Sequence, residues 1–113
     1  MPNKADISLG QKKFTLQQSI ELAVHHHNAE NYAKAESIYR HILKAEPNQP
    51  QALHLLGMIA YQGGQKKQAV ELITKALSVD PDYPEAHSNL GSVLQDLGLS
   101  EESISSFNKA IKL

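Results

Sequence analysis

The chain has 113 residues, of which 41% are hydrophobic and 20% charged, a balance that suits one folded domain and argues against disorder. Its formal net charge is -1, so no overall positive field would draw it to nucleic acid or to an anionic membrane surface. The absence of cysteine excludes disulfides, thiolate metal sites and cysteine nucleophiles. No apolar run resembles a signal peptide or a membrane span. We therefore expect a cytoplasmic protein without nucleic-acid or membrane partners.

Residues 1–14 are polar and contain glycine, which is typical of a flexible N-terminal lead-in. From residue 15 onward, apolar side chains recur at helical spacing between breakers. This pattern predicts six helices, at 15–29, 31–45, 50–62, 65–79, 84–97 and 100–113.

Glycine and proline mark the ends of these predicted helices. Gly64 and Gly98 follow first helices of a pair, where a left-handed cap costs glycine least. Pro50 and Pro84 open helices, because the first helical residue needs no backbone N–H. Ser100, followed by acidic residues, is expected to cap the last helix.

Matching residues recur at an interval of 34 positions. So many coincidences at one period predict an internal repeat, with units at approximately 16–49, 50–83 and 84–113 in one domain spanning 15–113. The matching pairs include Leu56 and Leu90, Gly57 and Gly91, Gly64 and Gly98, Ala76 and Ala110, and Pro47 and Pro81.

Small side chains occupy the middle of each predicted helical hairpin. Ala23, Gly57 and Gly91 on the first helices would face Ala35, Ala69 and Ser103 on the second helices, and this would let the paired axes approach closely. A lone hairpin cannot bury both of its faces, so we expect three hairpins stacked into an all-α, right-handed α-solenoid with a concave surface.

The 34-residue helix-turn-helix unit resembles the tetratricopeptide repeat (TPR) over roughly residues 16–113. The third unit is similar to repeats in the arms of O-linked N-acetylglucosamine transferases. The first unit departs most from the pattern, since Ala23 replaces the usual glycine, Glu30 the turn glycine and Ile42 the second alanine.

In this family the first helices line the concave groove, and the resemblance implies that the groove binds a peptide or a helix of a partner protein. The lysines and asparagines with which some members hold a carboxylate are absent, and only Asn89 matches an asparagine ladder, with Leu55 and Glu21 at the other rungs. The N-terminal half of the implied groove is largely apolar and the C-terminal half polar and neutral. The implied groove residues are Ile20, Val24, His27, His54, Met58, Tyr61, Ser88, Ser92 and Gln95.

No pattern in the sequence indicates catalysis, a metal site or a cofactor. Consecutive helical residues point about 100° apart, so the run His25–His27 cannot converge on one ion. The carboxylates and serines of the helices lack a partnered histidine in a recognisable motif, so packing and solvated surface explain them. We expect a protein that is not an enzyme.

Three further hypotheses stay open at this point. In the first, the chain is a substrate-presenting segment of a larger enzyme such as a glycosyltransferase. In the second, it is an RNA-binding array, although the lack of a stripe of Lys and Arg in the groove argues against RNA binding. It would also associate with itself through the C-terminal helix, because an end face of a repeat array is built to receive another unit. Candidates for uncovered apolar residues there are Leu94, Leu97, Ile104 and Ile111.

Overall fold

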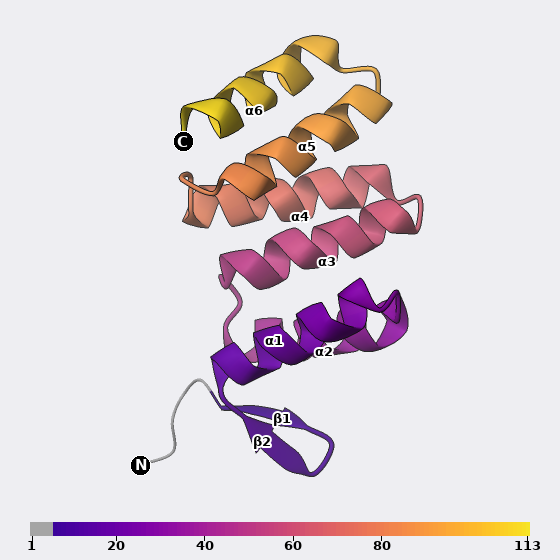
Figure 1. The fold of residues 1–113 in the computed structure, drawn as a ribbon, viewed down its shortest axis with the longest axis vertical. Coiled ribbons are helices and arrows are strands. Elements are labelled where there is room, and N and C mark those ends of the chain that lie inside the picture. The colour runs from indigo at the N-terminus through magenta and orange to yellow at the C-terminus, as the bar shows by residue number, and fades with distance from the viewer. Residues whose placement is uncertain (1–5) are drawn as a thin grey trace.

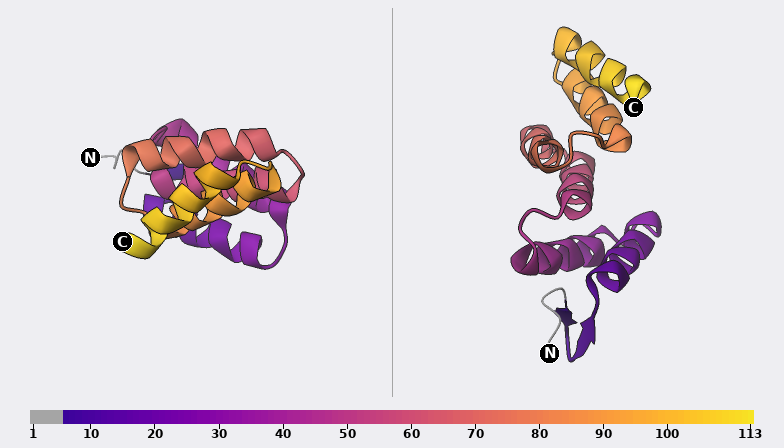
Figure 2. Two further views of the ribbon diagram at one scale, coloured as in Figure 1. Left: turned by 90° about the horizontal axis from the view of Figure 1, so that it is seen from above. Right: turned by 90° about the vertical axis from the view of Figure 1, so that its left-hand side faces the viewer.

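The computed structural model describes residues 6–113 as a short β-hairpin followed by helical pairs stacked along the long axis (Figure 1). The right-hand view of Figure 2 shows the same succession of pairs from the side. The longest dimension of the fold is 47 Å. The predicted helix bounds agree with the observed ones to within one residue, and the all-α solenoid is confirmed. The elements are β1 (Ile7–Leu9), β2 (Lys12–Phe14), α1 (Leu16–Asn28), α2 (Tyr32–Ala45), α3 (Pro50–Gln62), α4 (Lys66–Val79), α5 (Pro84–Asp96) and α6 (Ser100–Lys112).

The first helices α1, α3 and α5 begin where the sequence supplies a cap or a proline. Thr15 forms a capping box with Gln18 at the start of α1, and Pro50 and Pro84 are the first residues of α3 and α5. The expected cap at Ser100 is wrong: the N-cap of α6 is Leu99, and Ser100 is already the first helical residue. None of the helices among the described residues is long and apolar enough to cross a membrane.

Each first helix ends in a left-handed residue two positions beyond its last helical residue. This residue is Glu30 after α1, with φ of 61°, Gly64 after α3, with φ of 81°, and Gly98 after α5, with φ of 79°. The backbone N–H of the next residue reaches back five residues, as Asn31 N does to His26 O at 2.8 Å. This is the Schellman arrangement, which glycine adopts without the steric cost that a Cβ imposes.

Glu30 is the one non-glycine residue at these turns, and replacing it by glycine should therefore stabilise the protein. We expect Glu30→Gly to raise the free energy of unfolding by about 1 kcal/mol, because the left-handed strain is relieved. Chemical denaturation followed by circular dichroism measures the change. Gly64→Ala is the reciprocal control, since it introduces the same strain and should lower stability by about the same amount. An unchanged or lower stability for Glu30→Gly would contradict this reading of the turn.

The core lies between the helices of each pair and between neighbouring pairs. Ala23, Ala35 and Ala69 are fully buried, as the close approach of paired helices requires. Two clusters of buried residues result, one around Tyr39 and Ile42 and the other around Ile73 and Val93. The small residues predicted at the crossings therefore lie in the core.

Residues 7–14, which belong to the segment expected to be a flexible lead-in, form a β-hairpin, so that expectation is wrong for them. Residues 1–5 of the same segment lie outside the described residues. Gly10, with φ of 66°, is the first of the two residues that connect the strands, a position that suits glycine in a type II′ turn. β1 lies against α2 and β2 against α1, and Ile7 is buried in the first cluster. The hairpin therefore covers the N-terminal end of the helical array.

Candidate functional site: the concave groove

Residues from three successive first helices border one pocket of about 670 Å³. Val24 comes from α1, Leu55 from α3 and Asn89 from α5, so the pocket runs across the repeats rather than within one of them. We call this pocket, with the adjoining faces of α1, α3 and α5, the groove. The remaining residues that border the pocket are Gln49, Pro50, Gln51, His54, Asp80, Tyr83 and Glu85.

One wall of the groove is built by a hydrogen-bonded chain of three side chains. In the neutral ring of His54, Nε2 accepts a hydrogen bond from Asn89 Nδ2 at 2.7 Å, which leaves Nδ1–H to donate to the Tyr83 hydroxyl at 2.9 Å. The His54 and Tyr83 rings also meet edge to face, with centroids 4.9 Å apart. Because the three residues come from α3, α5 and the loop between α4 and α5, the chain joins the second and third units.

His54 is held in its neutral form. Burial lowers the pKa of its ring to about 4, although the nearby Glu85 carboxylate raises that pKa in part. Burial, with Glu85 and Asp80, also raises the pKa of Tyr83 to about 12, so the phenol keeps its proton. The wall therefore consists of uncharged rings beside carboxylates.

A second pair of side chains joins α3 to α5 further along the groove: the Tyr61 hydroxyl donates a hydrogen bond to Asp96 Oδ2. In the first unit, His27 Nδ1 lies 3.3 Å from the hydroxyl of Tyr39, and its ring contacts Tyr32 and Tyr39 edge to face. Burial lowers the pKa of His27 as well. These polar groups therefore fix the positions of neighbouring helices.

The structure places the implied groove residues in two kinds of environment. Ile20, with 4% of its surface exposed, and His54, with 2%, are buried, so neither is free to contact a partner along an open face. The physical reason is that Ile20 belongs to the same core cluster as Leu56, whereas His54 is enclosed by Tyr83 and Asn89. Half-buried are Val24, His27, Met58, Tyr61, Ser88 and Ser92, and Gln95 is exposed.

Of the implied groove residues, Val24 and His54 border the pocket. Sequence reasoning missed the acidic residues Asp80 and Glu85 and the aromatic Tyr83. The repeat period offered a signal for them. Tyr83 stands 34 positions after Gln49, each just before the proline that opens a first helix, and Glu85 stands 34 positions after Gln51.

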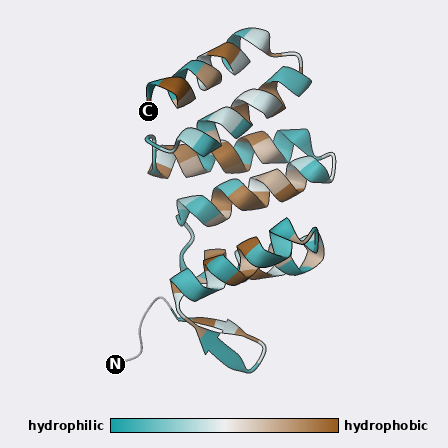
Figure 3. Ribbon diagram, in the orientation of Figure 1, coloured by the Kyte–Doolittle hydropathy of each residue, from teal (hydrophilic) through white to brown (hydrophobic). Residues whose placement is uncertain are grey.

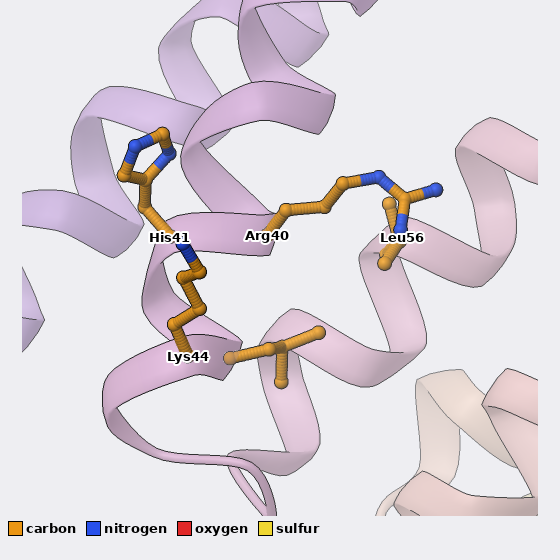
Figure 4. Close-up of a pocket in the computed structure, with 5 residues that line it drawn as sticks. Arg40, His41, Lys44 and Leu56 are labelled. Atoms are coloured by element: carbon orange, nitrogen blue, oxygen red, sulfur yellow. The ribbon is translucent and has the colours of Figure 1, made fainter.

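A different pocket, of about 480 Å³, lies between α2 and α3 and has cationic borders (Figure 4). Arg40, His41 and Lys44 of α2 surround its apolar part, which includes Leu56 of α3. Arg40 is paired with Glu36, with 3.6 Å between Nε and Oε2. No group of three or more His, Asp or Glu side chains within residues 6–113 is arranged to hold a metal ion.

The models of the tetratricopeptide repeat family match residues 26–91 and, separately, residues 84–113. The chain therefore belongs to the tetratricopeptide repeat family. A comparison with curated proteins gave no match.

Solved structures of repeat proteins superpose on most of the chain. A crystal structure of MamA is 20% identical with a TM-score of 0.75, covering 85% of this chain and 56% of MamA. A mutant O-GlcNAc transferase from Thermobaculum terrenum is 28% identical with a TM-score of 0.83, covering 86% of this chain and 19% of the transferase. The second TPR of Spaghetti (RPAP3), bound to the HSP90 peptide SRMEEVD, is 18% identical with a TM-score of 0.78, covering 84% and 88%. The chain thus spans about half the length of the MamA structure.

Proposed function

We propose that the protein is an interaction module that holds an extended peptide or a helix of a partner protein in the groove. The observation that carries this proposal is the pocket of about 670 Å³ that joins residues of α1, α3 and α5. A pocket that crosses the repeats can follow a partner segment over several side chains, as concave surfaces of solenoids do. The peptide bound to the second TPR of Spaghetti is a precedent for this mode on the same fold.

The polar side chains of the groove support a binding role without catalysis. His54 and Asp96 are the residue types that serve as acids and bases, but each is committed to a hydrogen bond that joins two helices. We therefore assign these groups to the framework of the groove. The half-buried Val24 and Met58 are the apolar side chains that we propose to contact a partner.

Acidic substitutions in the apolar part of the groove should abolish binding. In the variant Val24→Glu with Met58→Glu, two charges would have to be desolvated against a partner's apolar side chains, so we expect loss of captured partner. Affinity capture followed by mass spectrometry compares the variant with the wild type, and circular dichroism confirms that the helices persist.

The matched control places the same two acidic groups on exposed positions of α4, as Thr74→Glu with Val79→Glu. This variant should capture the same partners as the wild type. Capture that survives the groove substitutions in a folded protein would contradict the groove as the binding surface.

A second candidate function is the presentation of a substrate by a segment of a larger enzyme. The similarity to the Thermobaculum terrenum transferase favours it, because the segment that matches this chain makes up 19% of that larger enzyme. A catalytic domain encoded downstream in the same reading frame would support this function, whereas a stop codon after Leu113 would contradict it.

We also propose that the protein associates with itself through α6. Ile104 is 60% exposed and Ile111 81% exposed, and apolar residues lie along α6 at the end of the array (Figure 3). Leu94, by contrast, is buried and Leu97 half-buried, so these two are not the uncovered residues. An exposed apolar end face tends to be covered by a second copy.

Sedimentation velocity over a hundredfold range of concentration tests self-association. We expect the weight-average sedimentation coefficient to rise with concentration for the wild type and to stay constant for Ile104→Lys with Ile111→Lys. A wild-type protein that is monomeric over the whole range would contradict the proposal.

A further inference from the structure

The charges of the helices are separated between first and second helices. The first helices α1, α3 and α5 contain the carboxylates Glu21, Glu85 and Asp96 and neither Lys nor Arg. Every cation of a helix therefore stands on α2, α4 or α6, a set that comprises Lys34, Arg40, Lys44, Lys66, Lys67, Lys75, Lys109 and Lys112.

The carboxylates that border the pocket have no cation beside them. Asp80 and Glu85 border it, and none of the other residues that do so is Lys or Arg. Within residues 6–113 the salt bridge that forms is Arg40 with Glu36, on α2. Because no cation among the residues that border the pocket balances these two carboxylates, they produce a local negative potential, which favours a cationic partner.

The oxygen atoms of the pocket point to the same chemistry. Asn89 donates from Nδ2 to His54, and its Oδ1 forms no hydrogen bond within the described part of the chain. Nδ1 and Nε2 of His54 are both engaged by Tyr83 and Asn89. The ring also stays neutral at physiological pH, because burial lowers its pKa to about 4, so it supplies no positive charge. Gln49, Gln51 and Tyr83 can still donate, but the oxygens of Asp80, Glu85 and Asn89 are acceptors only, and they suit a ligand with N–H donors.

The lining of the pocket also includes apolar side chains, Val24 of α1 and Leu55 of α3. We propose that the groove selects an extended peptide segment in which Lys or Arg stands next to an apolar residue, the cation against Glu85 and Asp80 and the apolar side chain against Val24 and Leu55. This inference rests on the proposed function of the groove and specifies the chemistry of its partner. An acidic segment such as SRMEEVD, which the second TPR of Spaghetti binds, would bring like charges together here.

Selection from a displayed library of random twelve-residue peptides tests the inference, with the whole chain as bait. We expect the recovered peptides to be enriched in Lys or Arg next to Leu, Ile, Val or Phe. Fluorescence anisotropy then gives the affinity of the recovered peptides and of SRMEEVD, which we expect not to bind. Affinity for the recovered peptides should fall as salt is raised from 50 to 200 mM, since rim charges make binding depend on ionic strength.

The variant Asp80→Asn with Glu85→Gln removes both charges and keeps the acceptor that Asp80 offers to the N–H of Asp82. We expect it to weaken binding of the basic peptides about tenfold and to lose most of the salt dependence. The control Glu101→Gln with Glu102→Gln removes the same charge from exposed positions of α6. It should leave the affinity for the basic peptides and its salt dependence unchanged.

Each outcome of this experiment decides between the proposals. Recovered peptides that are acidic or without charge preference, or an affinity that the groove variant leaves unchanged, would overturn the inference while leaving the groove as a binding site. Failure of the wild type to enrich any peptide would overturn the peptide-binding function and this inference together.

Discussion

Replacing Gly57 by leucine should lower the free energy of unfolding by about 2 kcal/mol or more and the melting temperature by roughly 10 °C. A Cβ at Gly57 would lie 2.9 Å from Ile73 Cγ1 and 3.3 Å from the carbonyl oxygen of Ala69, and Ile73 is fully buried. Leucine would gain nearly 1 kcal/mol of helix propensity over glycine, so a net loss requires that the helices be forced apart. Thermal unfolding followed by circular dichroism measures the effect.

Two other glycines provide the controls for this experiment. A Cβ at Gly63 would meet nothing closer than 3.6 Å, so Gly63→Ala should be neutral or slightly stabilising. A Cβ at Gly91 would meet the ring of Phe107, which is half-buried and can move, so Gly91→Ala should cost less than Gly57→Ala. A melting temperature that rises in Gly57→Leu would show that α3 and α4 are not held in close contact there.

The stability of the protein should fall as the pH is lowered from about 7 toward 4, and His54 should cause much of the fall. Its pKa is about 4 in the folded protein and 6.5 without burial, so the unfolded chain binds a proton that the folded protein excludes between these values. The lost stability is of the order of 3 kcal/mol for this one ring. The lowered pKa of His27 acts in the same direction.

Urea unfolding at pH 7.5, 6.0, 5.0 and 4.5 measures this dependence. His54→Gln should be less stable than the wild type at pH 7.5, because the hydrogen bonds to Tyr83 and Asn89 are impaired, but its stability should depend less on pH. His25→Gln, which changes an exposed ring of α1, is the control and should follow the wild-type curve. An equally steep curve for His54→Gln would show that His54 is not the residue responsible.

The helices could be predicted because the repeat period, the prolines and the turn glycines all act locally along the chain. The 34-residue interval between Gly57 and Gly91 places each helix in register with the next unit. The hairpin was missed because its strands are three residues long, too short for an alternating pattern to stand out, and its turn contains a single glycine, Gly10.

The groove could be predicted only in part, because the family pattern assigns positions to a helix face without showing what covers them. Ile20 occupies a first-helix position like that of Ser88, yet Ile20 is buried and Ser88 half-buried. Likewise, the hydrogen bond between His54 and Asn89 joins residues 35 positions apart in different units, and only the stacking of the units brings them together.

Chemical-shift mapping of the groove tests the central claim most directly. The whole chain, labelled with ¹⁵N, is titrated with the tightest-binding peptide from the library, and backbone amide shifts are followed to saturation. We predict the largest changes at Val24, Leu55, Met58 and Asn89 on the groove, with small changes on α2, α4 and α6. Changes centred on Arg40 and Lys44 at the pocket between α2 and α3, with the groove unaffected, would contradict the claim that the groove is the binding site.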